Sequence, residues 1–225
     1  MTIKAVLFDL YGTLTYVENP VSEWEASEFL VRRGYEVYPQ AYKAAWQFVT
    51  FIDYPRFGYK TWESYLKRVL ELLGQKPDDQ TLRELSKLYE KTTWKLYDDV
   101  EGALIKTKDL GLKTAIVTTI AKFKYKKAIE PVSDKIDLLV DGYTFRCEKS
   151  NSKIYLGTLK TLGVRAREAV MIGDDIQLDI MLPKTIGMRA ILLDRKGELS
   201  GEKCEGPDSI VNNLNQALDI IETWL

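Results

Sequence analysis

Histidine is absent from the 225 residues, and its absence excludes several kinds of catalytic site. Ser-His-Asp catalysis, Cys-His catalysis and His-based zinc sites all require an imidazole. Only two cysteines occur, Cys147 and Cys204, and they stand in unrelated contexts. Their number excludes a disulfide framework or a CxxC metal site and suits a reducing cytosol. Any chemistry therefore falls to Asp, Glu, Lys, Tyr or Thr, or to a hard metal ion held by oxygen atoms.

The chain also lacks an excess of charge of either sign and lacks long apolar runs. Its 32 basic and 33 acidic residues nearly cancel, which leaves no electrostatic footprint for nucleic acid or an anionic membrane. No apolar stretch reaches the roughly 20 residues that a membrane-spanning helix needs. The first residues lead into an apolar run without the layout of a signal peptide. We therefore expect a cytoplasmic protein whose partner is a small molecule.

From residue 100 onward, the sequence alternates between helical and strand-like segments. This alternation, with a further apolar strand far upstream, predicts an α/β fold with a doubly wound, Rossmann-like parallel sheet. We assign this core to residues 1–15 and 100–225. The predicted strands are 5–8, 113–118, 138–140, 169–172 and 190–193, and the predicted helices are 101–111, 122–130, 152–162 and 213–225, with a helix-like stretch up to Gly187.

Residues 16–99 have a different character and predict a helical domain inserted after the first strand. We expect helices over 21–34, 39–53, 60–74 and 78–97, and no strand in this segment. Most of the aromatic residues of the chain lie here, among them Trp24, Trp46, Trp62 and Trp94. They either pack the helices against one another or line a substrate pocket, and the spacing does not separate these two roles.

Polar residues stand at the carboxyl ends of the predicted strands, where parallel sheets bind their ligands. Asp9 ends the first apolar run and is followed by Gly12 and Thr13. Later strands end at Thr118-Thr119 and at Gly173-Asp174-Asp175, with Asp179 further on, and Lys149 opens the loop before a predicted helix. If the strands are parallel, these groups converge at one edge of the sheet.

A carboxylate nucleophile, hydroxyl groups, a lysine and a cluster of carboxylates suit phosphoryl transfer. Lys149, the Thr118 hydroxyl and backbone N–H groups would neutralise and orient the charge on a phosphoryl group. Mg²⁺ prefers a few oxygen ligands plus water, which Asp9 and Asp174 can supply. Attack by Asp9 on phosphorus would give an aspartyl-phosphate and divide hydrolysis into two easier steps.

In this order, the motifs resemble those of the haloacid dehalogenase superfamily with a helical cap of the first type. The matching segments are Asp9-Leu-Tyr-Gly-Thr13, Ile116-Val-Thr118, Lys149 and Gly173-Asp-Asp-Ile-Gln-Leu-Asp179. The resemblance covers essentially the whole chain. It implies a hydrolase with a Rossmann-like core and a cap over residues 16–99, acting on a small phosphorylated molecule with Mg²⁺ as cofactor.

The resemblance also implies a role for each matching residue. Asp9 is the expected nucleophile and a metal ligand. Thr118 orients the phosphoryl group with the Thr119 backbone beside it, and Lys149 steadies the nucleophile and the transferred group. Asp174 is the expected principal metal ligand, and Asp179 is its direct or water-mediated partner.

Tyr11 departs from the pattern of the superfamily's phosphatases, which have a second aspartate at this position. A neutral tyrosine can donate a proton to a leaving group, but it is a poor acceptor at pH 7. We keep Tyr11 as a candidate catalytic residue and, through its backbone carbonyl, as a candidate metal ligand. Good leaving groups such as aryl or acyl phosphates would make the missing acid unnecessary.

A tyrosine at this position also resembles the 2-haloacid dehalogenases of the same superfamily, which need no metal. In that alternative, Asp9 attacks a carbon atom and forms an ester. The acidic Gly173-Asp174-Asp175 segment favours the phosphatase, because a carboxylate pair at the end of a buried strand is costly without a cation. A second alternative is a catalytically weak member of the superfamily that binds a phosphorylated ligand or a partner protein.

Two further residues affect how the last motif is placed. Asp175 is expected to cap the following helix rather than bind metal. Pro183 is expected to make that helix bend or begin late, because an interior proline interrupts an α-helix.

Overall fold

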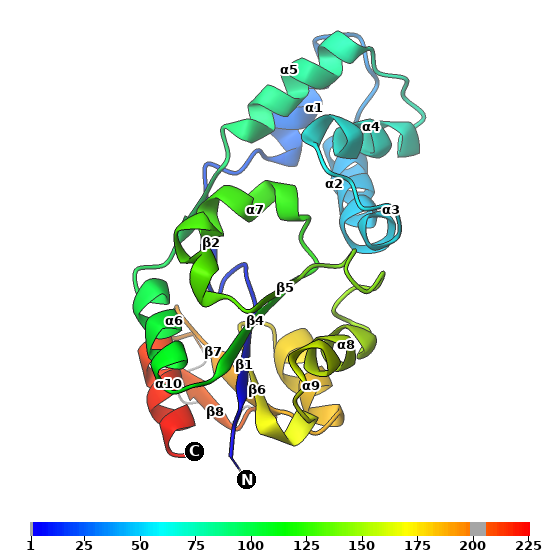
Figure 1. Ribbon diagram of the computed structural model, residues 1–225. Helices are drawn as coiled ribbons and strands as arrows, with labels where there is room; N and C mark the ends of the chain where they lie inside the picture. The colour runs from blue at the N-terminus through cyan, green and yellow to red at the C-terminus, as the bar shows by residue number, and fades with distance from the viewer. Residues whose placement is uncertain (1, 199–205) are drawn as a thin grey trace.

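The computed structural model describes residues 2–198 and 206–225, and within them the predicted parallel sheet is present. The strands lie in the order β5-β4-β1-β6-β7-β8, and each neighbouring pair is parallel (Figure 1). Their bounds are Ala5–Phe8 for β1, Lys113–Val117 for β4, Leu138–Val140 for β5, Ala169–Gly173 for β6, Arg189–Leu193 for β7 and Ser209–Val211 for β8. The α/β fold is confirmed, and β8 is an edge strand that the sequence analysis did not include.

Strand β1 lies at the centre of the sheet and is buried on both faces. Its residues alternate between two hydrophobic clusters, with Val6 and Phe8 on one face and Ala5 and Leu7 on the other. Phe8 is level with Ile116 of β4 and Ile172 of β6. Asp9 follows directly, so a fully buried central strand holds it in place.

Helices cover both faces of the sheet (Figure 1). The first face packs against α6 (Val100–Asp109), α7 (Lys122–Ile129) and α10 (Leu214–Glu222). The second packs against α8 (Lys153–Leu162) and α9 (Leu182–Thr185). Shorter helical turns are η2 (Glu130–Lys135), η3 (Ala166–Glu168) and the π-helical η4 (Ile176–Met181). No helix in the described ranges is both long and apolar enough to cross a membrane.

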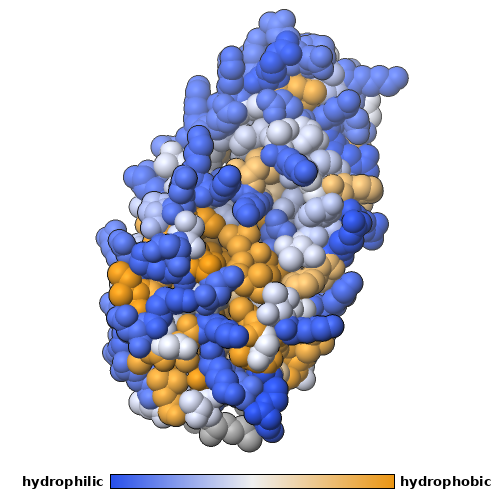
Figure 2. Space-filling view, viewed as in Figure 1, coloured by the Kyte–Doolittle hydropathy of each residue, from blue (hydrophilic) through white to orange (hydrophobic). Residues whose placement is uncertain are grey.

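A helical cap lies above the carboxyl ends of the strands, as predicted (Figure 1). It contains α1 (Glu23–Val31), α2 (Pro39–Phe48), the π-helical η1 (Val49–Asp53), α3 (Tyr54–Phe57), α4 (Trp62–Leu72) and α5 (Asp79–Glu90). Leu66, Val69 and Leu70 of α4 are buried in the core of the cap, where an apolar face at helical spacing places them. The surface over α1 and α5 is mainly hydrophilic, whereas apolar side chains reach the surface nearer the sheet (Figure 2).

The prediction of no strand between residues 16 and 99 was wrong. Strand β2 (Thr15–Glu18) pairs with β3 (Thr93–Leu96) in a two-stranded antiparallel sheet. The last cap helix accordingly ends at Glu90, not at residue 97. These two strands are short and are stabilised by each other, so neither has the long apolar pattern by which a strand is recognised in sequence. Their pairing brings the start and the end of the insertion together.

Cap and core also meet through polar and aromatic contacts. The Tyr54 hydroxyl of α3 donates a hydrogen bond to Asp141, which follows β5, at 2.5 Å between the oxygen atoms. Phe123 of α7 packs edge-on against Trp62 of the cap, with ring centroids 5.1 Å apart. Helix α7 therefore lies where the core and the cap meet. The division at residues 15/16 and 99/100 remains a prediction.

Candidate active site

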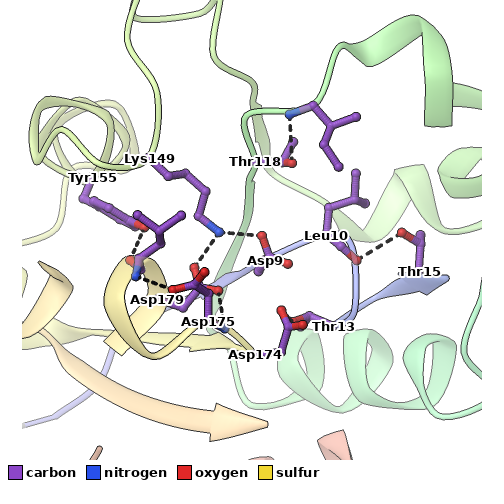
Figure 3. A network of polar contacts seen from close by, with 12 residues as sticks. Asp9, Leu10, Thr13, Thr15, Thr118, Lys149, Tyr155, Asp174, Asp175 and Asp179 are labelled. Carbon is purple, nitrogen blue, oxygen red and sulfur yellow. Dashed lines mark hydrogen bonds and ion pairs between the residues drawn. The ribbon is translucent and has the colours of Figure 1, made fainter. Parts of the chain in front are cut away.

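Asp9 and Lys149 form a buried ion pair at the carboxyl end of β1 (Figure 3). Lys149 Nζ lies 2.5 Å from Asp9 Oδ1, and both residues are buried. Lys149 reaches this position from the loop between β5 and α8, as the sequence analysis expected. The lysine thus neutralises the carboxylate and fixes its orientation.

Asp179 is the second carboxylate that contacts Lys149. Its Oδ1 lies 2.5 Å from Lys149 Nζ, and its other oxygen accepts a hydrogen bond from the Asp175 N–H at 3.2 Å. Burial raises the pKa of Asp179. Burial alone would lower the pKa of Lys149, but the charges of Asp179 and Asp9 outweigh it, and the net shift is upward. Lys149 is therefore a permanent cation held between two acids.

Two features of the backbone place Asp179 in the site. A Cβ on Gly173 would lie 2.3 Å from Asp179 Cγ, so only glycine leaves room for this carboxylate. Asp179 stands in the π-helical turn η4, and regular α-helix starts only at Leu182. Pro183 is therefore in the first turn of α9, where its missing N–H is tolerated. The expected late start of the helix is confirmed.

Asp175 caps η4, as predicted. One of its carboxylate oxygens accepts hydrogen bonds from the N–H groups of Gln177 and Leu178, both at 2.8 Å. Capping by aspartate satisfies N–H groups that have no partner within the helix. Backbone N–H groups thus bind this carboxylate oxygen of Asp175.

Asp174 completes a triad of carboxylates with Asp9 and Asp179. One oxygen atom from each of the three lies within 4.8 Å of the others. Asp174 forms no ion pair among the described residues, and the Thr13 hydroxyl donates a hydrogen bond to its Oδ1 at 3.5 Å. Burial, together with the charge of Asp9, raises its pKa to about 6. Asp174 is thus an exposed carboxylate that lines the cavity beside two buried ones, an arrangement consistent with a divalent metal site.

Gly12 lets the loop after Asp9 approach this triad closely. Its φ is +84°, and a Cβ there would lie 2.1 Å from Asp174 Oδ2. Any larger residue would be strained in its backbone and would displace the carboxylate. The donor set fits a divalent ion such as Mg²⁺, because hard cations bind carboxylate oxygens and three carboxylates meet here.

Thr118 and Thr119 follow β4 and are also buried in the site, as predicted. The Thr118 hydroxyl accepts a hydrogen bond from the Ile120 N–H at 3.2 Å, which tightens the turn after the strand. Both threonines line the same cavity as Asp9, Lys149 and Asp174. The structure thus brings the residues of all four predicted motifs to one edge of the sheet.

The cavity between this edge and the cap has a volume of about 560 Å³. Cap residues that line it include Trp46, Trp62, Tyr89 and Trp94, so some of the aromatic residues line the cavity as well as packing the cap. Tyr11 is half exposed beside them, and its ring meets Trp94 edge-on with centroids 5.8 Å apart. The Tyr11 hydroxyl has no hydrogen-bond partner within the described residues. A role for the Tyr11 carbonyl in metal binding remains a prediction.

Lys124 also lines this cavity and was not predicted from the sequence as a site residue. It stands in the lysine-rich segment Lys122-Phe-Lys-Tyr-Lys-Lys127, where most lysines face solvent. The aromatic residues on either side of Lys124 were the available signal, because Phe123 packs against the cap and Tyr125 against the sheet. Cys147 is a free thiol outside the carboxylate triad, and Cys204 lies outside the described residues.

Comparison with known proteins identifies the class of enzyme. The family model described as haloacid dehalogenase-like hydrolase matches residues 3–187. The chain therefore belongs to the haloacid dehalogenase-like hydrolases.

Similar proteins include both phosphatases and dehalogenases. The glyceraldehyde 3-phosphate phosphatase of Pyrococcus furiosus is 27% identical over 230 residues, which cover 98% of this chain and 93% of that protein. The crystal structure of a HAD phosphatase from Thermococcus onnurineus has a TM-score of 0.68 at 24% identity and covers 97% of this chain and 98% of its own. A 2-haloacid dehalogenase from Pseudomonas syringae pv. Tomato DC3000 has a TM-score of 0.72 at 18% identity, with both chains fully covered. These two likenesses show the fold.

Proposed function

We propose that the protein is a Mg²⁺-dependent phosphatase that hydrolyses a small phosphorylated molecule through an aspartyl-phosphate on Asp9. The observation that carries the proposal is the carboxylate triad, in which Asp174, without an ion pair of its own among the described residues, lies next to the Lys149-bound Asp9. The single ammonium of Lys149 does not balance three neighbouring carboxylates, and a divalent ion would supply the missing positive charge. The glyceraldehyde 3-phosphate phosphatase relative supports the same class of substrate.

Each residue of the site has a part in the proposed reaction. An oxygen of Asp9 attacks phosphorus, and the bond from phosphorus to the leaving group breaks. Thr118, the Thr119 backbone and Lys149 bind the phosphoryl oxygens. Water then attacks phosphorus, the bond to Asp9 breaks, and phosphate leaves with the carboxylate restored. Mg²⁺ held by Asp9 and Asp174, with Asp179 directly or through water, would offset the repulsion between the carboxylate and the phosphate ester.

The 2-haloacid dehalogenase is the second candidate, and Tyr11 is the observation that favours it. We would measure phosphate release from 4-nitrophenyl phosphate with Mg²⁺ and with EDTA, and halide release from 2-chloropropionate. For a Mg²⁺-dependent phosphatase, we expect phosphate release with Mg²⁺ and none with EDTA. Halide release that EDTA does not change would establish the dehalogenase instead. Neither activity, in wild type or Asp9→Asn, would indicate a binding protein.

The pH dependence of Mg²⁺ binding follows from Asp174. Its pKa is raised to about 6 without the ion, so below that pH the proton competes with the metal. We expect the Mg²⁺ affinity to fall below this value by about tenfold per pH unit for each proton that the metal displaces. Calorimetric titration with Mg²⁺ over a pH series tests this.

Asp174→Asn serves as the matched variant for this titration. It is expected to weaken Mg²⁺ binding strongly and to remove the part of the pH dependence that Asp174 causes, because an amide does not titrate. Asp175→Asn removes the charge of the neighbouring residue, which caps η4, and should keep that dependence. Mg²⁺ affinity that is the same at all pH values in the wild type would contradict the assignment.

Tyr11→Asp is expected to extend catalysis to poor leaving groups. An aspartate here would supply the acid that alkyl phosphates need, and general acid catalysis typically contributes about 10²–10⁴-fold. We expect kcat for an alkyl phosphate to rise while kcat for 4-nitrophenyl phosphate changes little. Tyr11→Asn, of similar size but without an acid, is the control. Equal gains in the two variants would show that removing the ring, not adding the acid, causes the effect.

A further inference from the structure

Lys124 extends from α7 of the core into a cage of aromatic rings that belongs to the cap. Its ammonium nitrogen lies 3.7 Å from the centroid of Tyr65, 4.2 Å from that of Trp46 and 5.2 Å from that of Trp62. The rings support one another, because Trp46 stacks on Trp62 and meets Tyr65 edge-on. Contacts with three ring systems hold the ammonium in one place.

This ammonium has no acidic partner in residues 2–198 and 206–225. Within the described residues, Lys124 forms no ion pair and donates no side-chain hydrogen bond, although it lines the cavity that contains Asp9. The other lysine of the cavity, Lys149, is bound to two carboxylates. Burial among the rings lowers the pKa of Lys124 well below its usual value, because no anion offsets the loss of water.

The geometry points to a ligand anion as the missing partner. Lys124 and Trp46, Trp62 and Tyr89 line the cap side of the cavity, whereas Asp9, Lys149 and Asp174 line its sheet edge. A small molecule with its phosphoryl group at Asp9 would extend toward the caged lysine. Electrostatic attraction between charges is stronger beside buried groups than in bulk water.

We propose that Lys124 binds a second anionic group at the end of the substrate remote from the transferred phosphoryl group, either a carboxylate or another phosphate. The substrate class is then a small phosphate ester with two separated negative charges. This inference rests on the proposed function for the position of the phosphoryl group. Lys124 is a specificity-determining residue in this account and takes no part in bond breaking.

The test uses phosphonates, which the enzyme cannot hydrolyse, so that binding is measured apart from catalysis. Phosphonoacetate, 3-phosphonopropionate and 4-phosphonobutyrate place a carboxylate at increasing distances, and each is compared with its primary amide. Calorimetry with Mg²⁺ present should show one acid binding roughly 10- to 100-fold more tightly than its amide, as expected for a charge-assisted hydrogen bond. Propane-1,3-bisphosphonate shows whether a second phosphate group is preferred to a carboxylate.

Lys124→Met keeps most of the apolar stem and removes the charge. The ratio of acid affinity to amide affinity should fall to about 1 in this variant, and Lys124→Arg should retain part of the preference because it keeps the charge. Lys126→Met, on the exposed side of the same helix, changes the net charge equally and should leave the ratio unchanged. If Lys124 only packed the cap against the core, Lys124→Met would change the thermal stability and would leave the ratio of acid affinity to amide affinity unchanged.

Two results would overturn the inference. One is a wild-type protein that binds acids and amides equally. The other is a preference for the acids that Lys124→Met retains. Either result would leave the proposed phosphatase intact, because the phosphonate group still binds. Failure of every phosphonate to bind would count against the phosphoryl site itself and therefore against both proposals.

Discussion

Asp9→Asn is expected to lower the rate of phosphate release by about 10⁴-fold or more, the range seen when a catalytic nucleophile is removed. The amide nitrogen and oxygen cannot attack phosphorus as a carboxylate does. The substitution keeps the size of the side chain at the buried end of β1, so the fold should persist. Steady-state phosphate release from 4-nitrophenyl phosphate with Mg²⁺ measures the loss.

The control for this variant is Asp109→Asn, which removes one negative charge from an exposed position at the end of α6. It should leave phosphate release unchanged. Circular dichroism and thermal unfolding establish that Asp9→Asn is folded. An Asp9→Asn protein with more than about a hundredth of wild-type activity would contradict nucleophilic catalysis by Asp9, because such a residual rate exceeds what the remaining site can supply.

Lys149→Met is expected to affect both catalysis and stability. Without the lysine, Asp9 and Asp179 would face each other as buried carboxylates with no cation between them. Removing one partner from a buried ion pair typically costs about 3–5 kcal/mol in the free energy of unfolding. Loss of a positive charge that contacts the transferred group should lower kcat about 10²–10³-fold. Urea unfolding in EDTA and steady-state kinetics measure the two effects.

The double variant Lys149→Met/Asp179→Asn separates these effects. Replacing Asp179 removes the second buried charge, so part of the lost stability should return. Activity should not return, because the phosphoryl group still lacks its lysine. If Lys149→Met is as stable as wild type and the second substitution changes nothing, the ion pair does not have the energetic role assigned here.

Strong local patterns made the core of the fold predictable. The apolar segment Ala5–Phe8 can only be buried, and Asp9, Gly12 and Thr13 at its end indicate a loop that approaches a ligand. Parallel topology then brings the ends of β4 and β6 to the same edge, with Thr118 and Asp174 beside Asp9. Asp175 was also predictable as a cap, because short carboxylates satisfy helix N-termini through local hydrogen bonds.

Features that depend on distant contacts were not predictable in this way. Strands β2 and β3 are stabilised by pairing between the two ends of the insertion, which no local pattern records. The π-helical turn that contains Asp179 brings its carboxylate to Lys149, which comes from a distant loop. Lys124 was missed because its environment is made by rings from α2 and α4, far away in the sequence.

The presence of Tyr11 leaves two reactions to consider for this chain, phosphoryl transfer and dehalogenation, and the same fold supports both. The carboxylate triad favours phosphoryl transfer, whereas the absence of an acid at position 11 limits the leaving groups. An enzyme of this kind should prefer aryl or acyl phosphates to alkyl phosphates, unless a residue in the cap supplies the proton. The fold alone does not separate the two chemistries, since solved structures of both kinds resemble it.

Detection of the phosphoryl group on Asp9 tests the central claim most directly. The protein would be mixed with 4-nitrophenyl phosphate and Mg²⁺, quenched in acid during turnover, digested, and analysed by mass spectrometry. The account predicts a peptide that contains Asp9 and carries one added phosphoryl group, absent in EDTA and in Asp9→Asn. Turnover with a burst of 4-nitrophenol but with the phosphoryl group on another residue would contradict it.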